Sequence, residues 1–212
     1  MKRGRFITVE GGEGVGKSTN IAWLASLLKA RGVTVRLTRE PGGTPMAERI
    51  RTLLLEHGDE PLPDLAELLL FFASRSLNIN NTIMPALDAG EWVICDRFTD
   101  ATHAYQGSGR RLDRSRIETL AEWVHDGLQP DLTVLLDAPP NVGRTRAAQR
   151  GAADRMESEQ DEFHARVRNG YLQLARDEPG RFAVIDANRD LGQIQAAIKA
   201  AVEPLLSAGA GP

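Results

Sequence analysis

A glycine-rich segment near the N-terminus carries the pattern that most directly indicates chemistry. Residues 11–18 read GGEGVGKS, which fits G-x-x-x-x-G-K-[ST] and lies between an apolar run and an amphipathic segment. Glycines allow successive backbone N–H groups to point inward, and these donors bind polyphosphate at a helix N-terminus. We expect Lys17 to reach the β- and γ-phosphates of ATP and Ser18 to ligate Mg²⁺. The expected ATP-binding residues are Gly11, Gly12, Glu13, Gly14, Val15, Gly16, Lys17, Ser18 and Thr19.

A phosphate loop indicates a nucleotide-binding protein without specifying a reaction. The N-K-x-D motif that reads guanine in GTPases does not occur, because no asparagine is followed by lysine. An accessory ATPase or a nucleotide sensor stays open. A small nucleoside monophosphate kinase is the other alternative, and it needs a second phosphate site for an acceptor and a basic lid.

Arginine-bearing segments that could form such a site follow several expected strands. Most of the 26 basic residues are arginines, whose planar guanidinium matches phosphate oxygens. The segments are LTREPGGT at 37–44, LLFFASR at 69–75, DRF at 96–98 and RGAADR at 150–155, and AYQG at 104–107 follows the DRF segment.

These motifs, together with EGGEGVGKST at 10–19 and QPDLT at 129–133, resemble the thymidylate kinase family, and its bacterial branch in particular. The resemblance extends over essentially the whole chain. It implies transfer of the γ-phosphoryl group of ATP to dTMP, with Mg²⁺, to give dTDP and ADP. A kinase for another pyrimidine monophosphate is the nearest alternative.

The resemblance implies roles for the acceptor site. Phe71 would stack on thymine and Arg75, one turn later, would donate to a thymine carbonyl, although a core position is the alternative for Phe71. Thr102 would contact the base edge and Tyr105 would lie near the sugar. The implied substrate-binding residues are Glu13, Arg39, Glu40, Pro41, Arg51, Phe71, Arg75, Arg97, Thr102, Tyr105 and Gln106.

The phosphate of the acceptor would be held by Arg97 and Arg39, with Arg51 nearby or on a solvated helix face. Asp96 would hold Mg²⁺ together with Ser18, or cap the following turn. Glu13 would repel polyphosphate, so we expect its carboxylate to face the acceptor sugar or an arginine.

The attacking atom would be a phosphate oxygen that is already anionic, so no general base is expected. Catalysis then consists of positioning and charge neutralisation, with Lys17, Arg97, Arg150 and Arg155 as the expected catalytic residues. Eukaryotic relatives carry an arginine where this chain has Gly14. The charge neutralisation that such an arginine provides would come instead from a lid at about 146–157. Arg146 and Arg150 of this lid would also contact ATP.

The hydrophobic pattern predicts alternating strands and helices. This favours a three-layer α/β/α fold of the P-loop NTPase type, with a five-stranded parallel sheet, a small lid and one domain over 1–212. Ligands on such sheets bind at the carboxyl ends of the strands. Expected strands cover 6–9, 33–37, 91–95, 132–136 and 182–185, and expected helices cover 21–28, 47–55, 65–89 (bent near Pro85), 113–126, 141–150, 157–178 and 191–206, with 207–212 as a frayed tail.

Composition and net charge indicate the cellular compartment of the protein and the classes of partner that it could bind. A net charge of -3 argues against a dedicated nucleic-acid binder, and no apolar run is long enough for a membrane span. A single cysteine, Cys95, is typical of a reducing compartment, so a cytoplasmic protein is expected. The resemblance implies a homodimer, for which helices around 65–89 and 113–126 could supply an apolar face.

Overall fold

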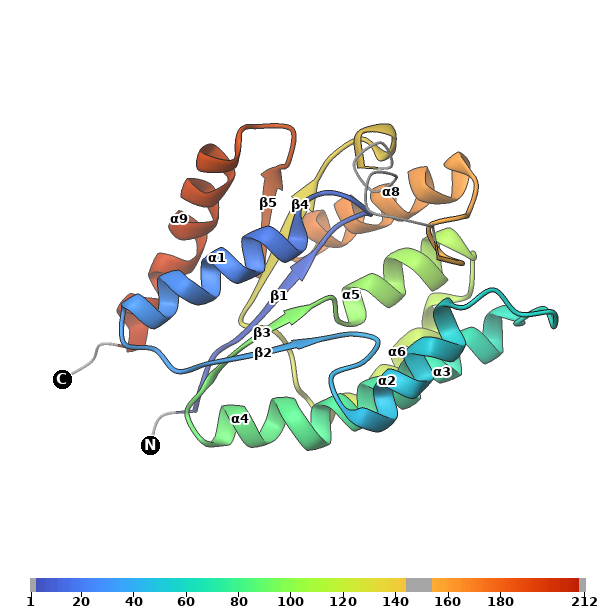
Figure 1. Cartoon of the computed structure of the whole chain (residues 1–212), viewed down its shortest axis with the longest axis horizontal. Helices are drawn as coiled ribbons and strands as arrows, with labels where there is room; N and C mark the ends of the chain where they lie inside the picture. The colour runs from blue at the N-terminus through green and yellow to red at the C-terminus, as the bar shows by residue number, and fades with distance from the viewer. Residues whose placement is uncertain (1–2, 144–153, 210–212) are drawn as a thin grey trace.

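The chain forms a five-stranded sheet in which every neighbouring pair of strands is parallel, as predicted. The computed structural model describes residues 3–143 and 154–209. The strand order is β2-β3-β1-β4-β5, so β3 and β4 flank β1 on opposite sides (Figure 1). The strands are β1 (Phe6–Glu10), β2 (Val35–Arg39), β3 (Trp92–Asp96), β4 (Leu132–Asp137) and β5 (Phe182–Asp186).

Helices cover both faces of this sheet and give it three layers (Figure 1). Helices α1 and α9 pack on one face, while η1, α4, α5, η2 and α8 pack on the other. The helical elements are α1 (Lys17–Ala30), α2 (Pro45–Leu55), α3 (Asp64–Asn78), η1 (Ile79–Ile83), α4 (Met84–Asp88), α5 (Thr99–Thr102), η2 (His103–Gly109), α6 (Arg114–His125), α8 (Asp161–Asp177) and α9 (Leu191–Gly209).

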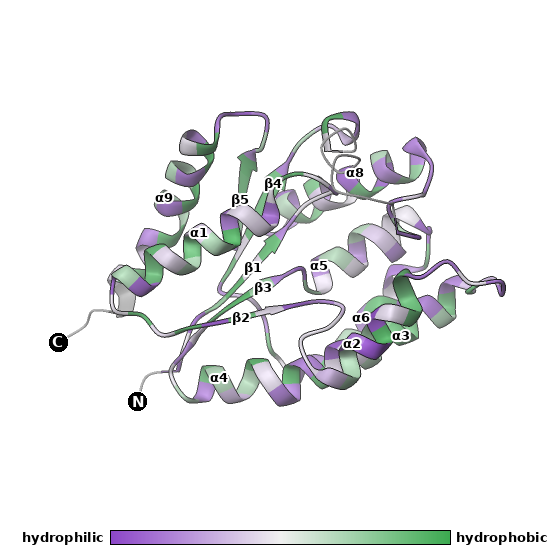
Figure 2. Cartoon of the chain, in the orientation of Figure 1, coloured by the Kyte–Doolittle hydropathy of each residue, from purple (hydrophilic) through white to green (hydrophobic). Residues whose placement is uncertain are grey.

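The strands β1 and β4 are buried on both faces, which explains their continuous apolar runs. On one face Ile7 and Val9 of β1 pack with Leu24 and Leu28 of α1 and with Ile198 of α9. Hydrophobic residues concentrate on the central strands in Figure 2. This two-sided burial fixes the sheet and therefore the positions of the loops at its carboxyl edge.

Several element boundaries differ from the sequence-based expectations. The second strand begins at Val35, because the Val33 amide donates to the Leu28 carbonyl and so belongs to the end of α1. The expected helix 65–89 contains the π-helical segment η1 just before Pro85, where a wider turn accommodates a residue that lacks an N–H.

Three more helical expectations need correction. Helical structure covers Thr99–Gly109, where none was predicted. The expected helix 157–178 begins only at Asp161, and the last helix continues to Gly209 and so includes part of the expected tail. The expected helix at 141–150 lies mostly outside the described residues.

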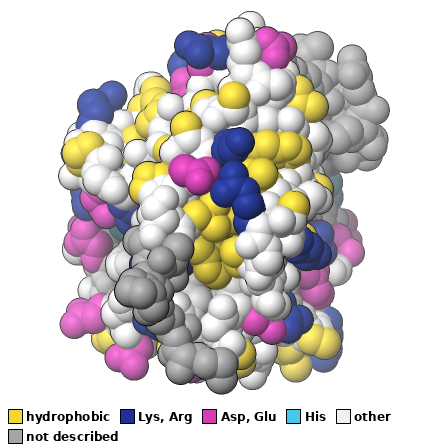
Figure 3. Space-filling view, turned by 90° about the vertical axis from the view of Figure 1, so that its left-hand side faces the viewer, with side chains coloured by type: hydrophobic (Ala, Val, Ile, Leu, Met, Phe, Trp, Pro, Cys, Tyr) yellow, Lys and Arg dark blue, Asp and Glu magenta, His cyan; other side chains and the backbone are white. Residues whose placement is uncertain are grey.

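The end of the molecule at which both termini emerge carries charged side chains of both signs among hydrophobic ones (Figure 3). Within the described ranges, none of the helices is long and apolar enough to cross a membrane.

The core predicts a strong dependence of stability on α1. Leu28 is fully buried in the cluster between α1 and the sheet, so Leu28→Ala should lower the free energy of unfolding by about 2–5 kcal/mol. The matched change Leu191→Ala, at a position 48% exposed, should cost less than about 1 kcal/mol. Urea unfolding of both variants measures the difference, and equal losses would contradict the packing described.

Candidate active site

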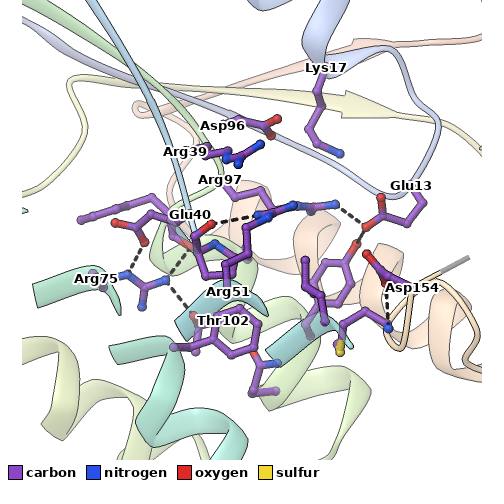
Figure 4. Close-up of a pocket in the computed structure, with 18 of the residues that line it drawn as sticks. Glu13, Lys17, Arg39, Glu40, Arg51, Arg75, Asp96, Arg97, Thr102 and Asp154 are labelled. Carbon is purple, nitrogen blue, oxygen red and sulfur yellow. Dashed lines mark hydrogen bonds and ion pairs between the residues drawn. The ribbon is translucent and has the colours of Figure 1, made fainter. Parts of the chain in front are cut away.

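A cleft lies at the carboxyl ends of β1, β2 and β3 (Figure 4). It brings together every acceptor residue expected from the sequence, and with them Lys17, Ser18 and Asp96. The acceptor residues lining it are Glu13, Arg39, Glu40, Pro41, Arg51, Phe71, Arg75, Arg97, Thr102, Tyr105 and Gln106. Segments more than 90 residues apart in sequence thus meet in one place.

The phosphate loop joins β1 to α1 at one wall of this cleft. Gly16 precedes the helix with φ 92, a left-handed conformation that glycine adopts without steric cost. The Lys17 ammonium donates to the Gly12 carbonyl over 2.8 Å and to the Gly11 carbonyl over 3.3 Å. Burial lowers the pKa of Lys17, and the nearby Arg97 lowers it further. Ser18 and Thr19 lie in the first turn of α1.

The tip of the loop is packed against the segment that follows β4. A Cβ atom on Gly14 would lie 1.9 Å from the Gly143 carbonyl oxygen, and one on Gly143 would lie 2.0 Å from the Glu13 carbonyl oxygen. Any side chain at position 14 would therefore displace this segment, which leads to the expected lid. This contact gives a physical reason why glycine suits position 14 better than a loop arginine.

The Arg97 guanidinium connects the end of β3 to the phosphate loop. It forms an ion pair with Glu13 and donates to the Gly11 carbonyl over 2.8 Å, and it lies 4.9 Å from the centre of the Tyr105 ring (Figure 4). The Tyr105 hydroxyl donates to the same Glu13 carboxylate over 2.8 Å. Burial alone would raise the pKa of Glu13, but Arg97 and Lys17 outweigh it and lower the pKa to about 2.

Behind Arg97 lies a buried carboxyl group that sequence reasoning did not single out. Glu10, the last residue of β1, accepts from the Phe98 amide over 2.6 Å and from the Tyr171 hydroxyl over 2.7 Å. Burial raises its pKa to about 8, and repulsion from Asp100 adds to the effect. The EG pair at 10–11 was visible in the sequence, but its partners were not.

Arg75 lies at the base of the cleft and is almost fully buried. Its Nε donates to Glu40 over 2.6 Å, and one Nη donates to the Thr102 hydroxyl over 2.9 Å (Figure 4). Its other terminal nitrogen, Nη1, has no hydrogen-bond partner in the part of the chain that the structure describes. Burial raises the pKa of Glu40, although its contact with Arg75 opposes that shift.

Two consecutive phenylalanines of α3 have different surroundings. Phe71 is half-buried and lines the cleft, whereas Phe72 packs in a core cluster with Leu68 and Ile117. Phe71 therefore lies at the cleft and not in the core, and its contact with a base stays a prediction. Phe72 instead lies under the Arg75 guanidinium, 4.8 Å from it.

Two further arginines line the cleft with partners of their own. Arg39 forms an ion pair of 2.7 Å with Glu48, which raises the pKa of Arg39. Arg51 donates to the Pro41 carbonyl over 2.8 Å, and burial lowers its pKa. The latter contact shows that Arg51 does not simply project into solvent.

Asp96 ends β3 next to the phosphate loop. Its Oδ1 is buried and has no hydrogen-bond partner among residues 3–143 and 154–209. An unpaired carboxylate oxygen in a cleft that also contains Ser18 suits a hard cation such as Mg²⁺. These two residues fit the predicted metal site.

The expected lid residues divide into two groups. Arg146 and Arg150 lie outside the described residues. Arg155 does not line the cleft: its Nε donates to the Leu54 carbonyl over 2.9 Å, and Nη2 lies 2.7 Å from the buried Glu67 carboxylate. Its contact with a transferring phosphoryl group stays a prediction.

The residues around Arg155 add wall groups to which the sequence assigned no individual role, although three of them lie in the expected lid at about 146–157. Asp154, Met156 and Glu157 line the cleft, as does Leu55 of α2. Glu67 lies behind them and also accepts from Gln106 over 2.7 Å. Asp154 lies in the RGAADR motif at 150–155, but no short motif marks Leu55 or Glu67, because their contacts join segments distant in sequence.

Comparisons with known proteins agree with one another. The family model described as thymidylate kinase matches residues 9–198. A thymidylate kinase of Methylococcus capsulatus is 54% identical over 207 residues, which cover 98% of this chain and 99% of the relative. A thymidylate kinase of Chromohalobacter salexigens is 57% identical over 202 residues, which cover 94% of this chain and 95% of that relative. A crystal structure of thymidylate kinase from Ehrlichia chaffeensis superimposes with a TM-score of 0.77 at 35% identity, covering 95% of this chain and 99% of that one.

The raised pKa of Glu10 predicts a pH dependence of stability. Between its ordinary pKa of 4.5 and its folded pKa of about 8, the folded state binds a proton that the unfolded state has lost. The contribution of Glu10 to the free energy of unfolding therefore decreases as pH rises through this window. Glu10→Gln cannot ionise, so its stability relative to the wild type should increase from pH 5 to pH 8.

Urea unfolding at both pH values measures this difference. Glu56→Gln, at an exposed position, serves as the control for loss of a carboxylate. A constant difference between wild type and Glu10→Gln would show that Glu10 ionises equally in both states.

Proposed function

This chain belongs to the thymidylate kinase family and phosphorylates dTMP, and we propose that ATP, held with Mg²⁺ at the phosphate loop, supplies the phosphoryl group. The observation that carries the proposal is that Lys17 and Ser18 of the loop line the same cleft as Arg75 and Arg97 of the acceptor side. Donor and acceptor phosphates would meet between these residues.

The acceptor nucleotide would lie with its base at Arg75. The unpaired Nη1 of Arg75 would donate to a thymine carbonyl, while Thr102 holds the same guanidinium in place. Phe71 would stack on the base. Tyr105 and Glu13, which share a hydrogen bond of 2.8 Å, would contact the sugar.

The acceptor phosphate would lie against Arg97, with Arg39 and Arg51 at its outer side. The ion pair of Arg97 with Glu13 fixes the guanidinium before the substrate binds, and such preorganisation reduces the cost of ordering during transfer. A phosphate oxygen of dTMP then attacks the γ-phosphorus without a protein base, the bond from the γ-phosphorus to the β–γ bridging oxygen breaks, and ADP leaves. Lys17 would neutralise charge on the β- and γ-phosphates.

Ser18 and Asp96 would hold Mg²⁺, which would offset the negative charge of the phosphates when bound. We assign to Arg150 the neutralisation of the remaining negative charge on the transferring phosphoryl group. Arg146 would contact the bound ATP. Arg155 would act beside them, and its contact with Glu67 favours a role in holding the segment that follows position 153.

The proposal also covers assembly and location. We propose a cytoplasmic homodimer built from one kinase domain over 1–212. Large hydrophobic side chains stand exposed on three helices that pack together. They are Met46 and Leu53 on α2, Leu65 and Leu69 on α3, and Trp123 on α6.

A panel of acceptors tests the reaction and the residues assigned to it. ADP release from ATP with Mg²⁺ should be fastest with dTMP, compared with dUMP, UMP and CMP. Arg97→Ala should lower kcat/KM for dTMP about 100-fold, because truncating one partner of a buried charged contact costs roughly 2–5 kcal/mol.

The matched control for this variant is Arg36→Ala, an exposed arginine on the edge strand β2, which should retain full activity. ATP binding that persists with no acceleration by any acceptor would instead identify a nucleotide sensor or accessory ATPase. A preference for UMP or CMP would identify a kinase for another pyrimidine monophosphate.

The dimer can be tested by charge substitution on the proposed face. The double variant Leu53→Glu/Leu69→Glu should be a monomer by light scattering at micromolar concentration, where the wild type should be a dimer. Leu37→Glu, at a position 46% exposed on β2, is the matched control and should leave the dimer intact. A monomeric wild type would exclude the proposed assembly.

A further inference from the structure

We propose that Glu10 is a positioning residue for the acceptor phosphate: it holds the backbone of Arg97 in a left-handed conformation from which the guanidinium reaches the cleft. This inference rests on the proposed role of Arg97 in binding the dTMP phosphate. Glu10 itself does not line the cleft and is fully buried, so it would act only through its neighbours.

The conformation of Arg97 is unusual for a residue with a side chain. Its φ is 69, in the left-handed region that a Cβ atom disfavours. Such a conformation persists only where the surrounding structure fixes it, and it occurs preferentially at functional sites. At Arg97 the chain turns sharply after β3, and this turn directs the Arg97 side chain toward the phosphate loop.

Hydrogen bonds fix this turn on both sides of Arg97. The Arg97 amide donates to the Val9 carbonyl over 3.1 Å, and the Cys95 thiol donates to the Arg97 carbonyl over 2.9 Å. The next amide, that of Phe98, points back toward β1 and donates to Glu10 Oε1 over 2.6 Å. The last two contacts use side chains, those of Cys95 and Glu10, and of these two only the Glu10 carboxyl also contacts Tyr171.

The second carboxyl oxygen of Glu10 also helps to position the Arg97 guanidinium. Glu10 Oε2 accepts from the Tyr171 hydroxyl over 2.7 Å, and that hydroxyl accepts from Arg97 Nη1 over 3.2 Å. One carboxyl group therefore fixes both the backbone after Arg97 and, through Tyr171, one of its terminal nitrogens. Tyr171 is 1% exposed, so water does not replace either bond readily.

The charges that face Glu10 are consistent with this role. Arg97 favours its ionised form, whereas Asp100 and burial oppose ionisation. A hydrophobic residue would fill this position without such a conflict, but it would leave the Phe98 amide without its acceptor. The hydrogen bonds, and not packing alone, therefore distinguish glutamate here.

A double-mutant cycle on the full-length enzyme tests the inference. Glu10→Ala should raise the KM for dTMP at least 10-fold while the KM for ATP changes less than 2-fold. Glu10→Gln should stay within about 3-fold of the wild type, because its amide oxygen can still accept from the Phe98 amide. In an Arg97→Ala background, adding Glu10→Ala should change the KM for dTMP less than 2-fold.

Distinct results would overturn the proposal. Equal increases in both KM values, or the same effect of Glu10→Ala with and without Arg97, would reduce Glu10 to a purely structural group. If Arg97→Ala raises the KM for dTMP but Glu10→Ala does not, only this inference fails. If Arg97→Ala leaves that KM unchanged, the role proposed for Arg97 fails as well.

Tyr171→Phe provides a second test if Glu10→Ala does not fold. It removes the hydroxyl link to the Arg97 guanidinium and keeps the contact between Glu10 and the Phe98 amide. The KM for dTMP should rise about 3- to 10-fold with the KM for ATP unchanged. An unchanged KM for dTMP in this variant would contradict the link through Tyr171.

Discussion

The ion pair between Arg97 and Glu13 is the contact on which the cleft depends. It joins the end of β3 to the phosphate loop, two segments that are 84 residues apart in sequence. Both side chains are largely shielded from water, at 15% and 19% exposure, so each charge needs the other. Loss of either partner would leave a largely buried charge without its ion-pair partner where the donor and acceptor sides of the cleft meet.

Elsewhere in the cleft, arginines are likewise paired with carboxylates. Arg75 pairs with Glu40 in the interior, and Arg39 pairs with Glu48 nearer the surface. These pairs allow several cations to lie close together before an anionic substrate arrives, without the full cost of their mutual repulsion. The net charge of -3 is therefore compatible with a strongly basic binding site.

The parallel sheet brings these pairs into register. Arg39 at the end of β2 lies beside Asp96 at the end of β3, and Val9 lies beside Asp96 on the other side. Because β3 and β4 flank β1 on opposite sides, the phosphate loop emerges where the connections diverge, which is the usual ligand position in open α/β sheets. The backbone thus places the charged side chains before any of their own contacts form.

The sequence by itself determined the features that local patterns encode. The glycine and lysine spacing at 11–18 specified the phosphate loop, the alternating apolar runs specified a five-stranded parallel sheet, and motif resemblance identified the residues that line the cleft. Boundaries failed where a local contact competed with the pattern, as at Val33, whose amide completes the end of α1.

Only the tertiary structure decided which partners these residues have. Tyr171 reaches Glu10 across 161 positions, and Arg155 turns to Glu67 although its motif favours a phosphate contact. No periodicity or spacing records such pairs, because they follow from the order of strands and from the requirement that buried charges find partners.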